Sequence, residues 1–323
     1  MRAVRYFRYG GPEVLEVTEV PAPEPTAGQV LVEVEAVGAN AIDGVFRRGG
    51  GPWQRPLPGR LTGDVVGRVV RLGPDVPAGI SVGQRVAALS EDAFAEIVAV
   101  DAQWLAAVPE DAAAGEATAL SMTAPLALRL LATGQVGEGD TVLVHSAAGA
   151  VGHLAVQLAR TLGASTVIGT ASSRSKRDFA EQHGATLTVD STAADWADQV
   201  REAAPDGVDI VLDAVGGSVF EQGLDLLAPF GRMVAYGAIG GELPGISSQQ
   251  LFGGLRYTTA VSMLAWRQAR PALAREDITA VTRLWQAGEL RPAVHATCPL
   301  SATATIHDTL DRRANLGRLV AVP

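Results

Sequence analysis

Between residues 141 and 240, apolar strand-like segments alternate with amphipathic helical segments. We expect strands at 141–146, 166–170, 187–190, 208–217 and 231–240, with a helix after each of the first four. Strands that are apolar along their whole length are buried on both faces, as in a parallel sheet covered by helices. The alternation therefore predicts a doubly wound α/β domain.

The first 120 residues have a different pattern, in which short strands are separated by turn clusters rich in Gly and Pro. The strand-like segments lie at 14–20, 30–37, 65–72 and 85–89. This pattern favours an antiparallel, barrel-like domain. The C-terminal tail returns to helices and ends in the short strand GRLVAV, and we expect it to complete the first domain. Residues 1–122 and 266–323 would then form one domain, and residues 123–265 the other.

Composition excludes several classes of partner. The chain has 323 residues, of which 47% are hydrophobic, and a formal net charge of −9. Such a chain can bury the cores of two domains, and its acidity argues against a nucleic-acid partner. The single cysteine, Cys298, excludes an internal disulfide. No apolar run has the length of a membrane span, so we expect a cytoplasmic protein without a membrane partner.

A turn of small residues follows the strand at 141–146, within VLVHSAAGAVGHLAVQLA. A dinucleotide pyrophosphate binds to such a turn where small residues allow a tight turn, a close backbone approach and a close helix–strand contact. Ala147, Gly149 and Gly152 occupy these positions. Alanine is tolerable at the first of them if its φ is negative. The turn therefore predicts a dinucleotide site, and the alternative is that the small residues serve packing alone.

The end of the second strand distinguishes NADPH from NADH. An NAD site usually has an acidic residue about 20 residues after the glycines, where it binds the ribose 2′-hydroxyl. Thr170 stands there instead, followed by Ser172, Ser173, Arg174 and Lys176. Hydroxyls and cations suit a 2′-phosphate, which predicts NADPH. In the alternative interpretation a serine caps the next helix and the cations face water.

Motifs along essentially the whole chain resemble the zinc-independent quinone oxidoreductase branch of the medium-chain dehydrogenase/reductase superfamily. They include MRAVRYFRYGGPEVLEV, VGANAIDGVFRRGG, TGDVVGRVVRLGPDV, VLVHSAAGAVG, DIVLDAVGG and GRMVAYGAIGG. The resemblance implies a GroES-like, β-rich catalytic domain built from both termini and a Rossmann domain that binds NADPH. It also implies a homodimer joined through the edge of the Rossmann sheet. The apolar, β-prone segment 255–266 is the candidate for that edge, because an uncovered edge invites pairing.

The resemblance and the motifs together predict a set of cofactor contacts. These are Asn40, Thr123, Ala148, Gly149, Ala150, Val151, Gly152, Thr170, Ser172, Ser173, Lys176, Ser191, Val215, Tyr236, Gly237 and Arg313. Two positions depart from the family. Ser191 replaces a tyrosine that is common near the adenine ribose, and Val45 stands where some relatives have an active-site tyrosine.

The catalytic candidates are few because a metal is not expected. Residues 1–120 contain neither His nor Cys, the usual zinc ligands. The chemistry that fits is hydride transfer from NADPH to a conjugated electrophile, with a few hydrogen-bond donors for the developing enolate. Asn40, Asp43 and Thr62 are the candidates. Asp43 could equally be a structural carboxylate, and Asp64 is expected to order the site rather than to react.

Three functions remain open. The first is an NADPH-dependent, metal-free reductase of quinones or α,β-unsaturated carbonyls, with a small-molecule substrate. The second is a trans-acting 2-enoyl thioester reductase in a biosynthetic pathway. The cationic entrance for its carrier would be formed by Arg47, Arg48, Arg55 and Arg60. The alternative interpretation is that these arginines belong to a solvated basic loop. The third is a non-catalytic NADPH-binding redox sensor or structural protein, an idea to which Val45 lends some support.

Overall fold

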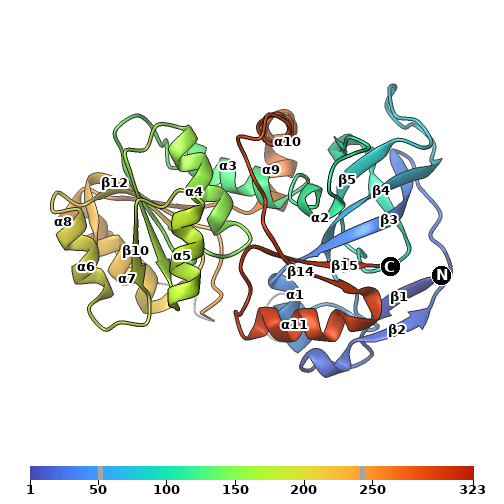
Figure 1. The fold of residues 1–323 in the computed structure, drawn as a ribbon, viewed down its shortest axis with the longest axis horizontal. Coiled ribbons are helices and arrows are strands. Elements are labelled where there is room, and N and C mark those ends of the chain that lie inside the picture. Colours follow the sequence, from blue (N-terminus) through green and yellow to red (C-terminus); the bar gives the residue numbers. More distant parts are fainter. Residues whose placement is uncertain (50–53, 241–244) are drawn as a thin grey trace. The chain divides into compact units, whose positions relative to one another are not determined.

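The protein is described by a computed structural model, which covers residues 1–49, 54–240 and 245–323. It forms two compact units (Figure 1). The first contains residues 1–123 and 278–323, and the second contains residues 124–277. We expected the second break near residue 266. Residues 266–277 belong to the second unit, because the Trp266 indole and the Arg129 guanidinium both bind the nearly buried Asp277 carboxylate.

The second unit is built on a parallel sheet. Its strands are β8 (Thr141–Val144), β9 (Thr166–Ala171), β10 (Leu187–Asp190), β11 (Val208–Asp213), β12 (Leu227–Ala235) and β13 (Tyr257–Ala260). Among the described residues they lie in the order β10-β9-β8-β11-β12-β13, and every neighbouring pair is parallel.

Helices cover both faces of this sheet. The helices between residues 123 and 286 are α3 (Thr123–Thr133), α4 (Gly152–Thr161), α5 (Arg174–Gln182), α6 (Trp196–Ala203), α7 (Gly217–Asp225), α8 (Ser248–Gly254), α9 (Met263–Ala269) and α10 (Pro271–Gln286), which continues into the first unit from Ile278. Helices α4 and α5 lie on one side of the sheet, and α6 and α7 on the other (Figure 1). Leu143, Trp196 and Phe220 share one core cluster, so β8, α6 and α7 pack together. The predicted doubly wound α/β domain is confirmed.

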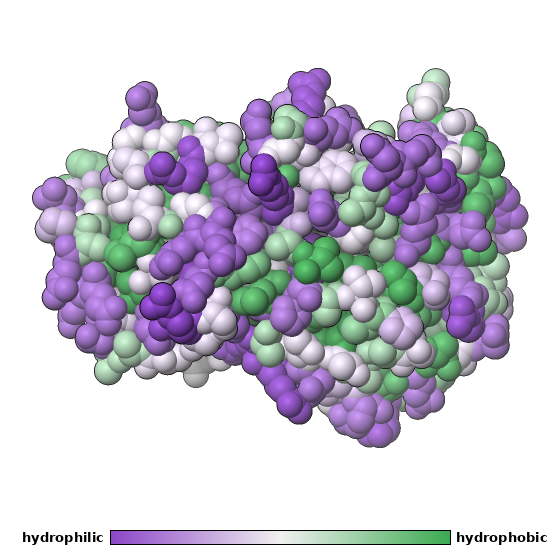
Figure 2. Space-filling model, viewed as in Figure 1, coloured by the Kyte–Doolittle hydropathy of each residue, from purple (hydrophilic) through white to green (hydrophobic). Residues whose placement is uncertain are grey.

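Helix α5 is the least buried of the helices next to β8 and β9. Ala180 is its one buried residue, whereas most of α4 is buried. Hydrophilic residues cover the visible face of α5 in Figure 2. Polar contacts nevertheless hold α5 against β10, because Arg177 pairs with Asp190 and the Thr188 hydroxyl donates to the Glu181 carboxylate, both at 2.6 Å.

The first unit is β-rich. Its strands are β1 (Arg2–Arg5), β2 (Glu16–Glu19), β3 (Gln29–Ala39), β4 (Gly63–Leu72), β5 (Arg85–Ser90), β6 (Ile97–Asp101), β7 (Ala106–Ala107), β14 (Val294–Pro299) and β15 (Arg318–Val322). Its helices are α1 (Ile42–Arg48), α2 (Ala114–Ala117) and α11 (Thr303–Asp311). In its larger sheet the order is β14-β15-β3-β4-β5-β7, with β6 also paired to β3.

The C-terminal strand belongs to this sheet. Strand β15 pairs antiparallel with β3, so that Val320 lies opposite Gly38. The tail thus completes the first unit, as the sequence predicts. The pairs that β3, β4 and β5 form are also antiparallel, in agreement with the alternating pattern of their residues.

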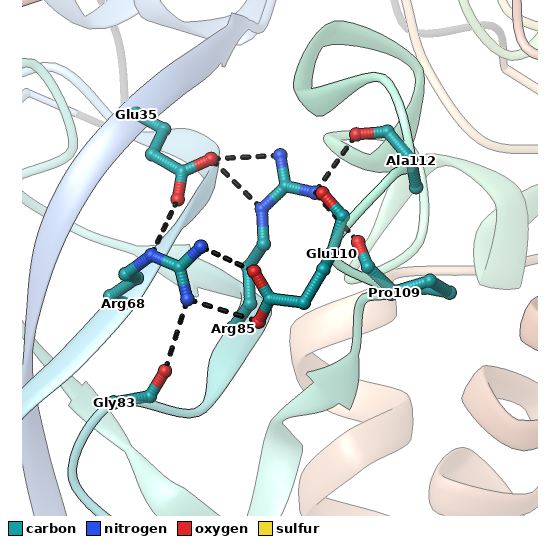
Figure 3. Close-up of polar contacts among 7 residues, drawn as sticks. All are labelled: Glu35, Arg68, Gly83, Arg85, Pro109, Glu110 and Ala112. Atoms are coloured by element: carbon teal, nitrogen blue, oxygen red, sulfur yellow. Dashed lines mark hydrogen bonds and ion pairs between the residues drawn. The ribbon is translucent and has the colours of Figure 1, made fainter.

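A cluster of charged side chains holds the loop before α2 (Figure 3). The nearly buried Arg85 guanidinium binds the Glu35 carboxylate and donates to the carbonyl oxygens of Pro109 and Ala112 at 2.7 and 2.8 Å. Arg68 contacts both Glu35 and Glu110. A planar guanidinium can satisfy several acceptors at once, so one buried side chain fixes the loop.

Candidate functional site

The turn after β8 has a left-handed residue that the sequence did not reveal. Ser146 has φ 55°, whereas Ala147 does not have a positive φ, so alanine is tolerated at the first position of the motif. Space for its methyl group comes from Gly169 on β9, because a Cβ there would lie 2.8 Å from the Ala147 Cβ. The Ala147 amide donates to the Thr170 carbonyl at 3.0 Å.

Gly152 holds α4 against this turn. A Cβ on Gly152 would lie 2.2 Å from the Ser146 carbonyl oxygen and 2.9 Å from the Ala147 Cα. Both neighbours are backbone atoms, so a side chain would force the turn and helix apart. Gly149 is less constrained, since its Cβ would lie 3.2 Å from the same oxygen.

The N-terminus of α4 is suited to an anion. Val151 is its N-cap residue and makes no side-chain cap hydrogen bond, and the first turn contains no acidic residue. The first N–H groups of a helix have no acceptor within the helix, and its dipole favours negative charge there. The amides of Ala150, Val151 and Gly152 therefore fit a pyrophosphate, with Ala148 and Gly149 in the adjoining turn.

The residues after β9 form a cationic, hydroxyl-rich end. Ser173 caps α5 by accepting the Lys176 amide at 3.4 Å, and the Lys176 ammonium lies 3.4 Å from the Ser172 hydroxyl. Arg174 pairs with Asp178 at 2.6 Å. Residues 171–177 contain no carboxylate. The two interpretations of this segment are therefore compatible, because Ser173 caps α5 while Lys176 lies beside the Ser172 hydroxyl.

Strands β11 and β12 end beside this region of the sheet. The buried Asp213 carboxylate accepts the amides of Val215 and Gly216 at 3.2 and 2.9 Å, and burial raises the pKa of this carboxyl. The Tyr236 amide donates to the Asp213 carbonyl at 2.8 Å. Burial, with the neighbouring Asp213, raises the pKa of the Tyr236 phenol, so this side chain stays neutral. The sequence analysis did not single out Asp213, although an acidic residue at the end of an apolar strand, shortly before two glycines, could have indicated it.

The carboxyl ends of parallel strands meet at one edge of the sheet. Strand β8 lies between β9 and β11, which makes its end the switch point where doubly wound sheets bind ligands. The turn before α4, the residues after β9, Val215, Tyr236 and Gly237 all follow strands at this edge. Ser191 follows β10, is exposed, and donates its amide to the Ala171 carbonyl at 3.1 Å.

Thr123 and Asp64 belong to a buried polar network in the first unit. Arg318 and Asp64 are fully buried and form an ion pair at 2.9 Å. The Ser121 and Thr123 hydroxyls donate to the same carboxylate, and Arg318 also contacts the Thr123 hydroxyl. Buried charges are retained where they are paired and hydrogen-bonded. Asp64 is thus a structural carboxylate, and the Thr123 hydroxyl already has two partners.

Asp43 and Thr62 form a second buried pair. The Asp43 carboxylate accepts the Thr62 amide at 2.9 Å and the Thr62 hydroxyl at 3.0 Å. Burial raises the pKa of Asp43 to about 7, against the opposing effect of the two hydrogen bonds from Thr62. The structure places the two catalytic candidates in direct contact, with an acid that is partly protonated at neutral pH.

Asn40 lies three residues before Asp43 in the chain. Its buried Nδ2 atom has no hydrogen-bond partner among the described residues, and an unsatisfied buried donor is costly unless a ligand uses it. The buried Tyr6 hydroxyl is also unpartnered there. Its pKa is raised by burial and by the nearby Asp43. Val45, at the position of the family tyrosine, is half-buried in α1.

Arg313 lies just beyond α11, with a left-handed backbone (φ 53°). It belongs to the first unit, and its contact with the cofactor stays a prediction.

The four arginines of the predicted cationic entrance each have an acidic partner. Arg47 is fully buried, and both it and Arg48 bind Asp311 at 2.6 and 2.9 Å. Arg55 pairs with Glu91 at 2.8 Å, and Arg60 lies 3.8 Å from Asp92. These four arginines thus share three acids, one of which, Asp92, also binds Arg5, so their positive charge is only partly balanced.

His145, which directly follows strand β8, is fully buried against Trp196. Burial lowers its pKa to about 4, so it is neutral at physiological pH. Its Nδ1 atom lies 3.1 Å from the Thr170 hydroxyl. Thr170 thus supports this ring from inside the sheet.

Comparison with known proteins gives the same architecture. Residues 26–110 match the alcohol dehydrogenase GroES-like domain family, and residues 150–276 match the family described as zinc-binding dehydrogenase. A quinone oxidoreductase of Pseudomonas aeruginosa is 31% identical over 331 residues, which cover 100% of this chain and 99% of the relative. The chain belongs to the quinone oxidoreductase branch of the medium-chain dehydrogenase/reductase superfamily, which confirms the resemblance.

Other relatives have different names. A 2-haloacrylate reductase of a Burkholderia species is 32% identical, covering 97% of this chain and 96% of the relative. The human synaptic vesicle membrane protein VAT-1 homolog is 30% identical, covering 100% of this chain and 86% of the relative. The family thus includes proteins named for more than one role.

Two solved structures contain NADPH. A mycobacterial protein in complex with NADPH superposes with a TM-score of 0.91 and 33% identity, and each chain is covered completely. The Escherichia coli quinone oxidoreductase in complex with NADPH superposes with a TM-score of 0.88 and 27% identity, also with complete coverage of both chains.

No helix in the described ranges has the length and apolarity needed to cross a membrane. Within the same ranges, no group of three or more His, Cys, Asp or Glu side chains is arranged to hold a metal ion.

Proposed function

We propose that this protein is an NADPH-dependent reductase that transfers hydride to a quinone or an α,β-unsaturated carbonyl compound without a catalytic metal. One observation carries the proposal. The uncapped N-terminus of α4 and the Ser172, Ser173 and Lys176 cluster lie after adjacent strands of one parallel sheet. A pyrophosphate and a 2′-phosphate fit these two places.

The residues of the second unit fit NADPH better than NADH. Lysine and hydroxyl groups replace the carboxylate that would bind a free 2′-hydroxyl. The Val215 amide is bound to Asp213, which fixes the backbone after β11. When bound, NADPH supplies the hydride. The protein holds the cofactor and shapes the surface that the substrate meets.

The first unit supplies polar groups for the substrate. Asn40 is the donor for the carbonyl oxygen on which negative charge develops, because its amide nitrogen is buried without a partner among the described residues. The half-exposed Ile42, two residues further along, offers an apolar surface. A conjugated, largely apolar electrophile matches this combination.

Asp43 and Thr62 provide the proton. Reduction of an enone adds one hydride and one proton. The proton can come from the Thr62 hydroxyl, which Asp43 then reprotonates. The contact between the two side chains and the raised pKa of Asp43 support this relay.

The thioester reductase receives less support. Its carrier would need exposed positive charge, but Arg47 is fully buried and Arg48, Arg55 and Arg60 each lie within 4 Å of an acidic side chain. A free small-molecule substrate is therefore the better match. The name of the Burkholderia relative, a 2-haloacrylate reductase, agrees with reduction of a carbon–carbon double bond next to a carboxyl group.

The protein is also proposed to be a homodimer. Strand β13 is the last strand of its sheet among the described residues, and large apolar side chains near it are exposed. Phe252 is 80% exposed, and Phe230, Leu255 and Tyr257 are each more than half exposed. An open edge beside an apolar surface favours pairing with a second copy.

The function is tested by a substrate panel. Purified protein with NADPH is mixed in turn with quinones, small enones and an enoyl thioester, and nicotinamide absorbance is followed. Turnover of quinones or enones is expected. Turnover of the thioester alone would favour the carrier-dependent reductase, and NADPH binding without any turnover would favour a non-catalytic sensor.

A further inference from the structure

His153 makes a side-chain hydrogen bond to the pyrophosphate turn. It is the second residue of α4 and is fully buried. Its Nδ1 atom lies 2.8 Å from the Gly149 carbonyl oxygen, and its backbone N–H donates to the same oxygen at 3.2 Å. A carbonyl oxygen only accepts, so Nδ1 carries the proton. Two donors from one residue therefore fix the orientation of the Gly149 peptide.

The same imidazole ring contacts α5. Its centroid lies 5.8 Å from the Phe179 ring and 5.3 Å from the His183 ring, which it meets edge-on. The ring centroids of Phe179 and His183 are 4.1 Å apart, and the His183 Nδ1 atom lies 2.7 Å from the Phe179 carbonyl oxygen. His153 thus joins the turn after β8 to the helix after β9.

This contact is the one that joins the turn to the start of α5. Ala180 is the one buried residue of α5, and the ion pair of Arg177 with Asp190 holds the helix to β10 rather than to the turn. Lys176, Phe179 and His183 lie three and four residues apart, so they share one face of the helix. A shift of Phe179 relative to His153 would move Lys176 with it.

We propose that His153 is a positioning residue that sets the preference for NADPH over NADH. It fixes the turn through Gly149 and, through the ring contact with Phe179, fixes the distance from that turn to the 2′-phosphate group held at the start of α5. The proposal rests on the placement of the 2′-phosphate at Ser172, Ser173 and Lys176 proposed above.

Two variants separate the two contacts of His153. Phe179→Leu removes the ring contact and keeps the bond to Gly149, so it should weaken NADPH binding about fivefold to tenfold and leave NADH within about twofold. His153→Phe keeps a ring and loses the donor, so it should weaken both cofactors by a similar factor. Dissociation constants are measured by fluorescence titration. Gln182→Ala, on an exposed position of α5, is the matched control and should change neither.

A third variant separates this proposal from the one on which it rests. Lys176→Ala should lose NADPH affinity selectively. If it weakens both cofactors equally, the 2′-phosphate is placed wrongly and this proposal is overturned with it. If Lys176→Ala is selective but Phe179→Leu affects both cofactors equally, or neither, the positioning role of His153 alone is overturned. Thermal unfolding of each variant shows that it is folded.

Discussion

The carboxyl group of Asp43 lies in surroundings that favour its neutral form. It is fully buried, and its two hydrogen bonds from Thr62 do not offset the loss of hydration. Burial penalises the charged form of a carboxyl group, and the folded protein therefore binds this proton more tightly than the unfolded chain. Asp311 is the opposite case. Burial raises its pKa, but the hydrogen bonds from Arg47 and Arg48 outweigh that effect and hold the pKa below its usual range.

The contribution of Asp43 to the free energy of unfolding should therefore fall as pH rises. The Asp43 pKa is raised from 3.8 to about 7 on folding, so its contribution is fully present below pH 4 and is lost as pH rises through 7. Between pH 5 and 8 this contribution should fall by about 2 kcal/mol. Buried His145 and His307, whose pKa values are lowered on folding, act in the opposite direction over this range, so the Asp43 contribution is measured as the difference between the wild type and Asp43→Asn in urea unfolding at the two pH values.

Asp311→Asn is the control for this experiment. The Asp311 pKa is depressed on folding, so its contribution is lost only as pH falls below about 4. This variant should be less stable by a similar amount at pH 5 and 8 and keep the wild-type slope. An unchanged slope in Asp43→Asn would show that Asp43 does not carry the buried proton, and the proposed relay would lose its donor.

Lys176 is the residue that should distinguish the two cofactors. A charge-assisted hydrogen bond to a phosphate is worth about 1.5–3 kcal/mol, so Lys176→Ala should weaken NADPH binding by about 10- to 100-fold and NADH binding much less. Isothermal titration with each cofactor measures both effects. Arg174 pairs with Asp178 on the same helix, and Arg174→Ala should have the smaller effect on NADPH.

At the scale of single elements, the turn between β8 and α4 is the most demanding part of the site. Gly152→Ala would place a Cβ 2.2 Å from the Ser146 carbonyl oxygen. We expect NADPH affinity to fall by at least about tenfold and the free energy of unfolding to fall by about 1–3 kcal/mol, because overpacking against backbone cannot relax locally. Cofactor titration and urea unfolding measure the two effects.

Gly137 is the matched glycine for that variant. It lies in a loop of the same unit, and a Cβ there would have no neighbour within 4 Å. Gly137→Ala should leave cofactor affinity and stability within about 0.5 kcal/mol of the wild type. If Gly152→Ala behaved in the same way, the close helix–strand contact would not be a requirement of the turn.

The sequence predicted the elements of this turn better than its geometry. The strand, the helix and the role of Gly152 follow from local pattern. The left-handed Ser146 and the space that Gly169 leaves for Ala147 do not, because they depend on where the neighbouring strand β9 lies. The aromatic contact between His153 and Phe179 is absent from any local pattern for the same reason.

At the scale of the whole molecule, the exposed edge of the second unit should join two copies. Tyr257 is the first residue of β13 and Phe252 lies in α8, and they have 58% and 80% of their surface exposed. Replacing both, as Phe252→Ser and Tyr257→Ser, should shift a dimer to monomers by weakening association at least about tenfold. Sedimentation velocity over a range of concentrations measures this shift. The double variant Val17→Ser and Val82→Ser, at exposed positions of the first unit, should sediment as the wild type does. A monomeric wild-type protein would contradict the proposed homodimer.

By itself, the sequence determined the doubly wound sheet, the β-rich first unit and the order of the motifs, because each depends on residue periodicity and on turns of a few residues. It also determined that residues 1–120 lack the usual zinc ligands. Only the tertiary structure decided which polar groups meet. It paired Asp43 with Thr62, buried Asp64 with Arg318, and matched the four candidate arginines with acids. The pKa of a side chain depends on burial and on partners distant in the chain, and these exist only once the chain has folded.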